Sequence, residues 1–210
     1  MVTFSVPVKE RGGKTGEHEK ESSFSFSVSD GAVLFAGSRY RCIPQKTCKE
    51  LVHQFAACGF SFLVGCAEGV DRSFRKVLAC TPYKDRCFVA CAFAHRVKYS
   101  YSYGLYASVV VPRNLPPKAA LHRRTIWMMK RCCMTVLFPE NPRDNSWGNG
   151  SKLVFRASMY HLKPVFVVCS TPPKNSIHYR VVSSNLFGVV EGYWVVPHPI
   201  SDGGTCDEEY

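Results

Sequence analysis

The sequence predicts an α/β fold in which helices cover both faces of a mainly parallel β-sheet, with an extra β segment near the C-terminus. Short apolar runs alternate with segments of helical periodicity, and this alternation is typical of parallel strands joined by crossover helices. Three glycine-containing turns precede helical segments, and they are Gly37–Arg39, Gly65–Asp71 and Gly148–Ser151. Backbone N–H groups converge at such turns, which therefore indicate a site for a phosphate-bearing ligand.

The composition and charge of the chain indicate what kind of partner the protein binds. The chain has 210 residues, of which 46% are apolar and 20% charged, as in an ordinary globular protein with one sizeable core. The net charge of +11 is uneven, since residues 31–200 carry 23 Lys/Arg and seven Asp/Glu, a net charge of +16. Such a basic region favours an anionic partner, either a nucleotide or a nucleic acid. A basic surface that serves only solubility is the alternative.

Cysteine usage and hydropathy indicate the compartment. The chain has 11 cysteines, most of them inside apolar runs, and no Cys-x-x-Cys pair. The N-terminus lacks a signal-peptide pattern, and no apolar run is long enough to span a bilayer. We therefore expect a cytoplasmic protein with free thiols and no membrane partner.

The first elements follow a polar segment. Residues 1–30 are rich in Ser, Gly, Lys and Glu, and we predict a flexible tail that ends in a short strand over Ser23 to Ser27. The apolar run Ala32–Ala36 predicts a first buried strand. Apolar residues at helical spacing predict a helix from Pro44 to Cys58, which Gly59 ends.

The middle of the chain continues the alternation. A second strand is expected at Ser61–Val64, a helix with one apolar face at Val70–Ala79, and a third strand at Arg86–Phe93. Residues 96–117 are rich in Tyr and Pro and carry no clear pattern, although Ala107–Val111 fits either a strand or an ordered loop.

The last parallel elements follow a basic helix. We predict this helix at Lys118–Cys132, a strand at Met134–Phe138, a helix at Lys152–Leu162 and a strand at Val165–Cys169.

Two further β-type runs come next, Tyr179–Val182 and Val189–Val196, and they predict a hairpin at the sheet edge. The chain thus divides into a tail (1–30), one nucleotide-binding domain (31–170), its β extension (171–200) and an acidic tail (201–210).

The order of four motifs resembles a known group. Gly37-Ser38-Arg39 is followed by Gly65-Cys66-Ala67-Glu68-Gly69-Val70-Asp71, then Arg124-x-x-x-Met128, then Gly148-Asn149-Gly150-Ser151. This order is similar to the SLOG superfamily of Rossmann-like domains, and most similar to its YspA/YpsA-related branch. The superfamily also contains the DNA-processing protein A domain and the LONELY GUY phosphoribohydrolases. The match spans Val33 to Val168, and Cys66 stands where the family usually has glycine.

The resemblance implies a ligand site at the motif positions. Its residues would be Gly37, Ser38, Arg39, Gly65, Ala67, Gly69, Asp71, Arg124, Gly148, Gly150 and Ser151. Arg39 and Arg124 would contact phosphate, for which the guanidinium fork is suited. Asp71 would either bind a ribose hydroxyl or only stabilise its helix dipole. No catalytic residue is predicted, because Val154 occupies the position of the phosphoribohydrolase glutamate.

Four functions stay open. The leading one is binding of a nucleotide, such as an adenine nucleotide or an ADP-ribose-type ligand, by a sensor module. The second is hydrolysis of an N-glycosidic bond with Glu68 and Asp71 as the acids. The third is binding of single-stranded nucleic acid through the basic helix 118–132. The fourth is an interaction protein that has lost its ligand. A homodimer through a sheet edge or this helix is compatible with each of them.

Two further clusters carry side chains that can bind ligands. Tyr99, Tyr101, Tyr103 and Tyr106 lie near Arg96 and Lys98, and they could stack bases or cover a sheet edge. Cys87, Cys91 and His95 are four residues apart, which would align them on a helix but has no special geometry on the expected strand. We therefore expect no metal site.

Overall fold

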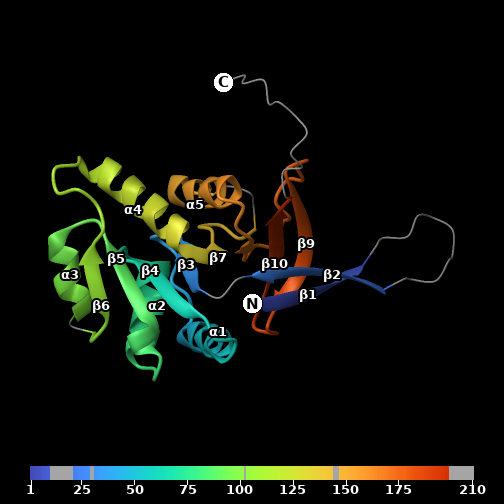
Figure 1. Cartoon of the computed structure of the whole chain (residues 1–210), viewed down its shortest axis with the longest axis horizontal. Coiled ribbons are helices and arrows are strands. Elements are labelled where there is room, and N and C mark those ends of the chain that lie inside the picture. The colour runs from blue at the N-terminus through green and yellow to red at the C-terminus, as the bar shows by residue number, and fades with distance from the viewer. Residues whose placement is uncertain (10–20, 29–30, 102, 144–146, 199–210) are drawn as a thin grey trace, which may run out of the picture.

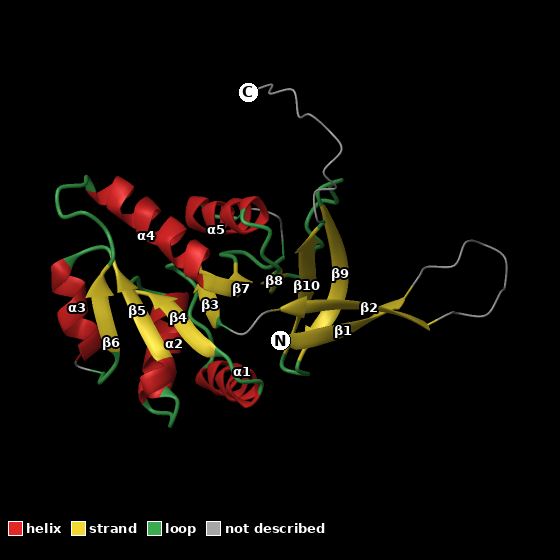
Figure 2. Cartoon of the chain, in the orientation of Figure 1, coloured by secondary structure: helices red, strands yellow, loops and turns green. Residues whose placement is uncertain are grey.

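A computed structural model describes residues 1–9, 21–28, 31–101, 103–143 and 147–198. It shows a three-layer α/β architecture with a separate two-stranded hairpin (Figures 1 and 2). In chain order the elements are β1 (Val2–Lys9), β2 (Glu21–Val28), β3 (Ala32–Gly37), α1 (Gln45–Ala57), β4 (Ser61–Gly65), α2 (Val70–Ala79), the 3₁₀ turn η1 (Lys84–Arg86), β5 (Cys87–Cys91), α3 (Ala94–Tyr101), β6 (Tyr106–Val109), α4 (Pro117–Arg131), β7 (Cys132–Phe138), α5 (Asn149–Tyr160), β8 (Val165–Val167), β9 (Tyr179–Leu186) and β10 (Val190–Pro197).

The main sheet has eight strands in the order β6-β5-β4-β3-β7-β8-β10-β9. The six strands from β6 to β8 are parallel, while β10 is antiparallel to both β8 and β9. The chain moves outward from β3 in one direction to β6, then crosses back to β7 on the other side of β3. The loops after β3 and β7 therefore diverge, and ligands bind at such a switch point in open α/β sheets.

Both faces of the sheet are covered, because the four consecutive residues Val33–Ala36 of β3, whose side chains point alternately to the two faces, are all buried. Phe35 and Leu34 are fully buried on opposite faces. Helices α1 and α2 pack on the Phe35 side, and α4 and α5 on the Leu34 side (Figure 1). The predicted Rossmann-like fold class is thus confirmed, including the C-terminal hairpin that extends the parallel sheet.

The predicted flexible tail is wrong for residues 2–9, which form a strand. The short strand predicted at Ser23 to Ser27 is confirmed, and it extends over residues 21–28. These stretches form β1 and β2, which pair antiparallel. Phe4 and Phe26 stack on each other at 5.5 Å, and both rings contact Trp194 of β10. Alternation of Ser or Thr with apolar residues gives this hairpin one apolar face, and packing against Trp194 offsets the entropy of ordering it. The rest of the predicted tail and the acidic tail 201–210 lie outside the described residues.

The Tyr-rich segment also has regular structure, since its residues form most of α3 and all of β6. Propensity could not decide this segment because α3 has a weak apolar face with only Ser100 buried. Within the described residues, no helix is long and apolar enough to cross a membrane.

Candidate functional site

The first two predicted turns pack directly on each other at the carboxyl edge of the sheet. The Val70 N–H donates to the Ser38 carbonyl at 3.1 Å. Gly69 has φ +66°, and a Cβ there would lie 2.4 Å from the Ser38 oxygen. A Cβ on Gly37 would lie 2.2 Å from the Phe138 oxygen at the end of β7. Glycine is therefore required at both positions by the close approach of neighbouring backbones.

Four of the predicted residues meet in a buried cluster behind these turns. Asp71 and Arg124 are only 6% and 7% exposed, and Asp71 Oδ2 accepts a hydrogen bond from the Ala67 N–H at 3.1 Å. The Arg124 guanidinium lies 3.9 Å from the same carboxylate oxygen. Gly65 leaves room for both groups, because a Cβ there would lie 2.2 Å from Asp71 Oδ2.

Sequence reasoning missed two members of this cluster, Arg75 and Cys66. Arg75 Nη1 donates to the carbonyls of Gly65 and Ala67 at 2.6 and 2.9 Å, so it fixes the shape of the second turn. Arg124 Nη1 donates to Cys66 Sγ at 3.3 Å. The helical periodicity of α2 gave a partial signal for Arg75, which lies four residues after Asp71 and three before Leu78, on the same side of the helix; all three are buried.

The cluster balances two guanidinium groups against a thiol and a carboxyl group. Hydrogen bonding from Cys91 and the nearby Arg124 charge lower the pKa of Cys66 to about 5, although burial opposes this shift. Burial raises the pKa of Asp71, and the charges of Arg124 and Arg75 counteract that rise. The thiolate form of Cys66 thus compensates positive charge that has been removed from water.

Cys66 is expected to be a thiolate at neutral pH. Since its pKa in the folded protein lies below the ordinary value of 9.0, its stabilising contribution is complete above pH 9 and is lost as the pH falls through about 5. Titration followed by the ultraviolet absorbance of thiolates should show a step near pH 5 that Cys66→Ser removes. The exposed Cys42 is the control site, and Cys42→Ser should leave the step in place. A wild-type protein without thiolate absorbance at neutral pH would contradict this assignment.

The third predicted turn forms the N-terminus of α5, which begins at Asn149 rather than at the predicted Lys152. Gly148 is the N-cap residue, and neither a side-chain cap nor an acidic residue occupies the first turn. Ser151 is 2% exposed, and its Oγ has no hydrogen-bond partner among the described residues. The Trp147 Nε1 atom is likewise buried and has no hydrogen-bond partner among the described residues. The Glu140 carboxylate lies beside Gly148, since a Cβ added there would be 3.2 Å from Glu140 Oε2. An anionic ligand that uses the donors of this helix end would have to displace that carboxylate.

Arg39 and Arg41 lie near the switch point in different settings. Arg39 is exposed, with its guanidinium 5.7 Å from the Tyr40 ring. Arg41, which sequence reasoning missed, donates to the carbonyl oxygens of Pro139 and Val168 at 2.9 and 3.4 Å. Arg41 thereby ties together the loops that follow β3, β7 and β8, whereas Arg39 is free to turn toward a ligand.

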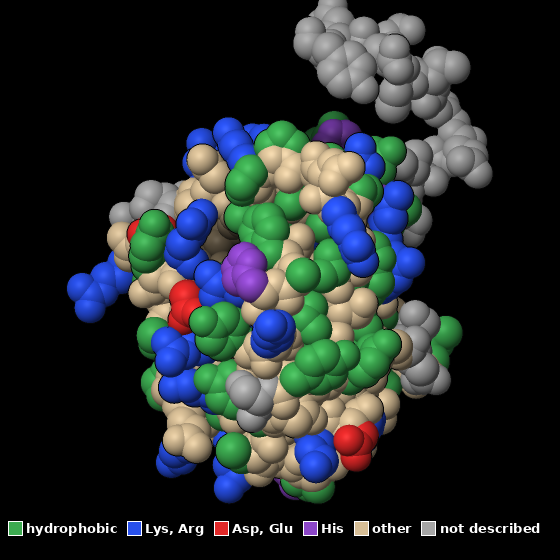
Figure 3. Space-filling model, turned by 90° about the vertical axis from the view of Figure 1, so that its left-hand side faces the viewer, with side chains coloured by type: hydrophobic (Ala, Val, Ile, Leu, Met, Phe, Trp, Pro, Cys, Tyr) green, Lys and Arg blue, Asp and Glu red, His purple; other side chains and the backbone are tan. Residues whose placement is uncertain are grey.

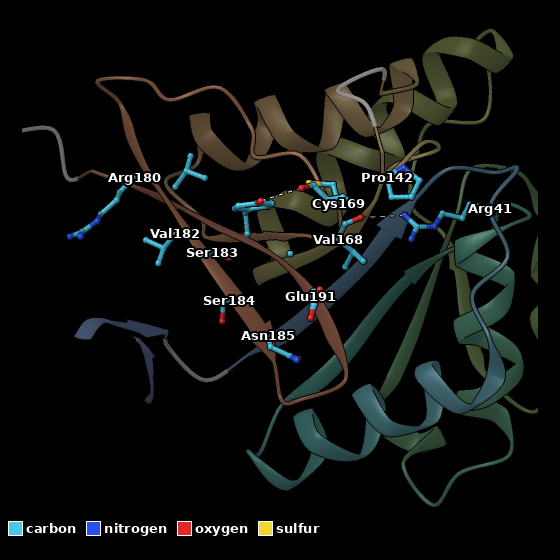
Figure 4. Close-up of a pocket in the computed structure, with 14 residues that line it drawn as sticks. Arg41, Pro142, Val168, Cys169, Arg180, Val182, Ser183, Ser184, Asn185 and Glu191 are labelled. Atoms are coloured by element: carbon cyan, nitrogen blue, oxygen red, sulfur yellow. Dashed lines mark hydrogen bonds between the residues drawn. The ribbon is translucent and has the colours of Figure 1, made fainter. Parts of the chain in front are cut away.

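A cavity of about 1030 Å³ lies beside Arg41 and the loops after β7 and β8 rather than on the predicted turns. Arg41, Pro142 and the segment Val168–Ser170 line one side of it, and the β9–β10 hairpin lines the other. Figure 4 shows Arg41 reaching Val168 at one end of the cavity, with Arg180 far away along the hairpin. Sequence patterns gave no signal for this cavity because it forms only when the hairpin folds beside β8.

The two acids considered for catalysis are engaged in other contacts. Glu68 pairs with Arg72 at 3.0 Å and with Arg96 at 3.5 Å. Asp71 is buried in the cluster described above. Both carboxyl groups are thus held by cations of the protein itself, Glu68 at the surface and Asp71 in the interior.

Comparison with known proteins shows which solved structures have a similar fold. No family model matches the chain, and no curated protein matches it. One similar solved structure is DNA processing protein A from Helicobacter pylori, described for a unique single-stranded DNA binding mode; it is 18% identical, with a TM-score of 0.49, over 70% of this chain and 66% of that one. Another is DNA processing protein A from Streptococcus pneumoniae, 17% identical, with a TM-score of 0.50, over 70% of this chain and 52% of that one. The chain thus spans between half and two thirds of these proteins, and it shares the Rossmann-like fold of DNA processing protein A.

Proposed function

We propose that the protein binds a nucleotide or a related phosphate-bearing ligand at the carboxyl edge of the sheet. The observation that carries this proposal is the buried, unpartnered Ser151 Oγ in the first turn of α5. A buried hydroxyl without a partner costs about 1–3 kcal/mol, and a phosphate oxygen at this helix end would remove that cost. The ligand class fits an adenine nucleotide or an ADP-ribose-type molecule, and the motif order supports a place in the YspA/YpsA-related branch of the SLOG superfamily.

The proposal divides the predicted site residues into two groups. Arg39, Gly148, Gly150 and Ser151 are the contact group, because Arg39 is exposed on the first turn and the other three lie at the start of α5. The second group comprises Gly37, Ser38, Gly65, Ala67, Gly69, Asp71 and Arg124; Ser38 belongs here because its N–H, carbonyl and hydroxyl groups are all hydrogen-bonded within the protein. The role of this group is to support the turns, because Asp71 Oδ2 and both terminal nitrogens of Arg124 contact the protein itself. Arg124 Nε is buried without a hydrogen-bond partner among the described residues, but the guanidinium faces Asp71 and Cys66.

Ser151→Ala is expected to weaken binding of ADP or ADP-ribose by about ten- to 150-fold, the value of a hydrogen bond to a charged group. The matched control is Ser158→Ala, because Ser158 is equally buried on α5 but donates to the Val154 carbonyl at 2.9 Å. Isothermal titration of the full chain with AMP, ADP and ADP-ribose would measure the affinities, after native mass spectrometry has identified any ligand that co-purifies. No binding by any of these nucleotides, or equal affinities for the two variants, would overturn the proposal.

We propose binding of single-stranded nucleic acid as a second function, and the charge distribution favours it. Residues 31–200 carry a net charge of +16. Figure 3 shows Lys and Arg side chains spread over the end of the molecule that carries α3, β6 and α4, with few acidic side chains between them. Arg124 does not belong to this surface, contrary to the predicted basic face of residues 118–132, because it is buried beside Asp71.

The oxidation state of the cysteines bears on the cellular compartment of the protein. Ten cysteines lie in the described part of the chain, and each of them is a free thiol. We propose on this ground that the protein acts in a reducing compartment such as the cytoplasm.

A further inference from the structure

A row of aromatic side chains ending in a cation lies at the amino edge of the sheet, opposite the proposed nucleotide site. The ring centroids of Tyr106 and Phe88 are 5.4 Å apart, and those of Phe88 and Trp127 are also 5.4 Å apart. The Arg131 guanidinium lies 4.0 Å from the centroid of the Trp127 ring. The four residues come from β6, β5 and α4, so only the tertiary structure brings them together.

This row is accessible from solvent. Tyr106 is 62% exposed, Arg131 is exposed, and Phe88 and Trp127 are half-buried. A cavity of about 440 Å³ opens over the row, bounded by the first residues of β3, β4, β5 and β6 and by the last turns of α4. This volume lies in the range of small-ligand sites and suits a planar base.

The charges around the cavity are mainly positive. Arg131 and Arg86 line it, and Asp85 is the single acid among its lining residues. The Arg86 guanidinium donates to the carbonyls of Ala56 and Phe60, so Arg131 is the lining cation that can turn to a ligand. Lys84 and Lys130 are exposed next to these arginines in the chain. Partly exposed aromatic rings flanked by cations attract phosphates and offer π-faces to bases, whereas an acidic rim would be needed for a basic protein partner.

We propose that this aromatic row, Tyr106, Phe88, Trp127 and Arg131, is a stacking site for the bases of single-stranded nucleic acid. Base–aromatic stacking tolerates every base, so the site selects single strands over duplexes rather than one sequence. The Asp85 carboxylate can accept a hydrogen bond from a base amino group, while the cations hold the backbone. This inference deepens the second proposed function and is independent of the nucleotide site at α5.

The test measures the binding of two oligonucleotides, one with bases and one without, by the wild type and by alanine variants of two tyrosines. A fluorescein-labelled oligothymidylate of about 16 nucleotides is titrated with the full chain, followed by an abasic strand of equal length, and fluorescence anisotropy gives both affinities. Wild-type protein should prefer oligothymidylate. Tyr106→Ala should weaken binding of oligothymidylate by about five- to 150-fold and leave the abasic strand unaffected. Tyr160→Ala is the matched control, since Tyr160 is 83% exposed and lies on α5.

The outcomes are distinguishable. Arg131→Gln provides a second variant. Arg131 is exposed and lies on α4, so this substitution does not touch the pairing of the β-strands. It should weaken binding of both oligonucleotides. If wild-type protein binds neither strand, both this site and the second proposed function are wrong. If it binds oligothymidylate and neither Tyr106→Ala nor Arg131→Gln weakens that binding, only the stacking site is wrong.

Discussion

Arg75→Met is expected to lower the free energy of unfolding by about 3–5 kcal/mol, the cost of removing one partner from a buried ionic cluster. Arg75 is 5% exposed, and its guanidinium donates to the carbonyls of Gly65 and Ala67. Its charge also counteracts the desolvation of Asp71. Methionine fills a similar volume but supplies neither the donors nor the charge. Urea denaturation followed by circular dichroism measures the loss.

Arg72→Met is the matched control, because the same substitution on the same helix removes an exposed cation. Arg72 pairs with Glu68 at 3.0 Å, and both side chains are about half exposed. Surface pairs of this kind contribute little to stability, so this variant should stay close to the wild type. Equal losses from Arg75→Met and Arg72→Met would show that the buried cluster does not hold the second turn.

Gly69→Ala is expected to destabilise the protein by about 2–5 kcal/mol, combining the strain of a left-handed residue with overpacking. Its φ is +66°, and the new Cβ would lie 2.4 Å from the Ser38 oxygen and 2.5 Å from the Arg39 carbonyl carbon. The first turn would have to move away from α2. We therefore expect weaker ADP binding as well as a lower midpoint in thermal unfolding.

Gly188→Ala is the control that separates backbone strain from the steric clash. Gly188 also has a positive φ, +73°, but nothing lies within 4 Å of an added Cβ. This variant should lose only about 1–2 kcal/mol, because it carries the backbone strain without the clash. Similar losses at both glycines would mean that the first two turns can separate without cost, which contradicts their close packing.

The succession of strands and helices was predictable because it depends on local periodicity. The predicted helix Val70–Ala79 agrees with α2 at both ends, and the apolar runs after residue 31 became strands of the main sheet. Segments without a strong pattern were not predictable. The strand β1 looked like part of a polar tail, although a strand was predicted within β2. The apolar residues of β1 acquire a partner only when Phe26 and Trp194 are folded against them.

The α/β class, the positions of the three turns and the excess of positive charge follow from the order of residue types along the chain. The packing of the elements controls which polar side chains of the turns face inward. Asp71 and Arg124 are 53 residues apart, and both were predicted to contact a ligand, yet they face each other inside the protein. It also joined Phe88, Tyr106 and Trp127 into one row at the amino edge. Spacing along the chain fixes which face of an element a residue occupies, but burial and ion pairing depend on which elements pack together.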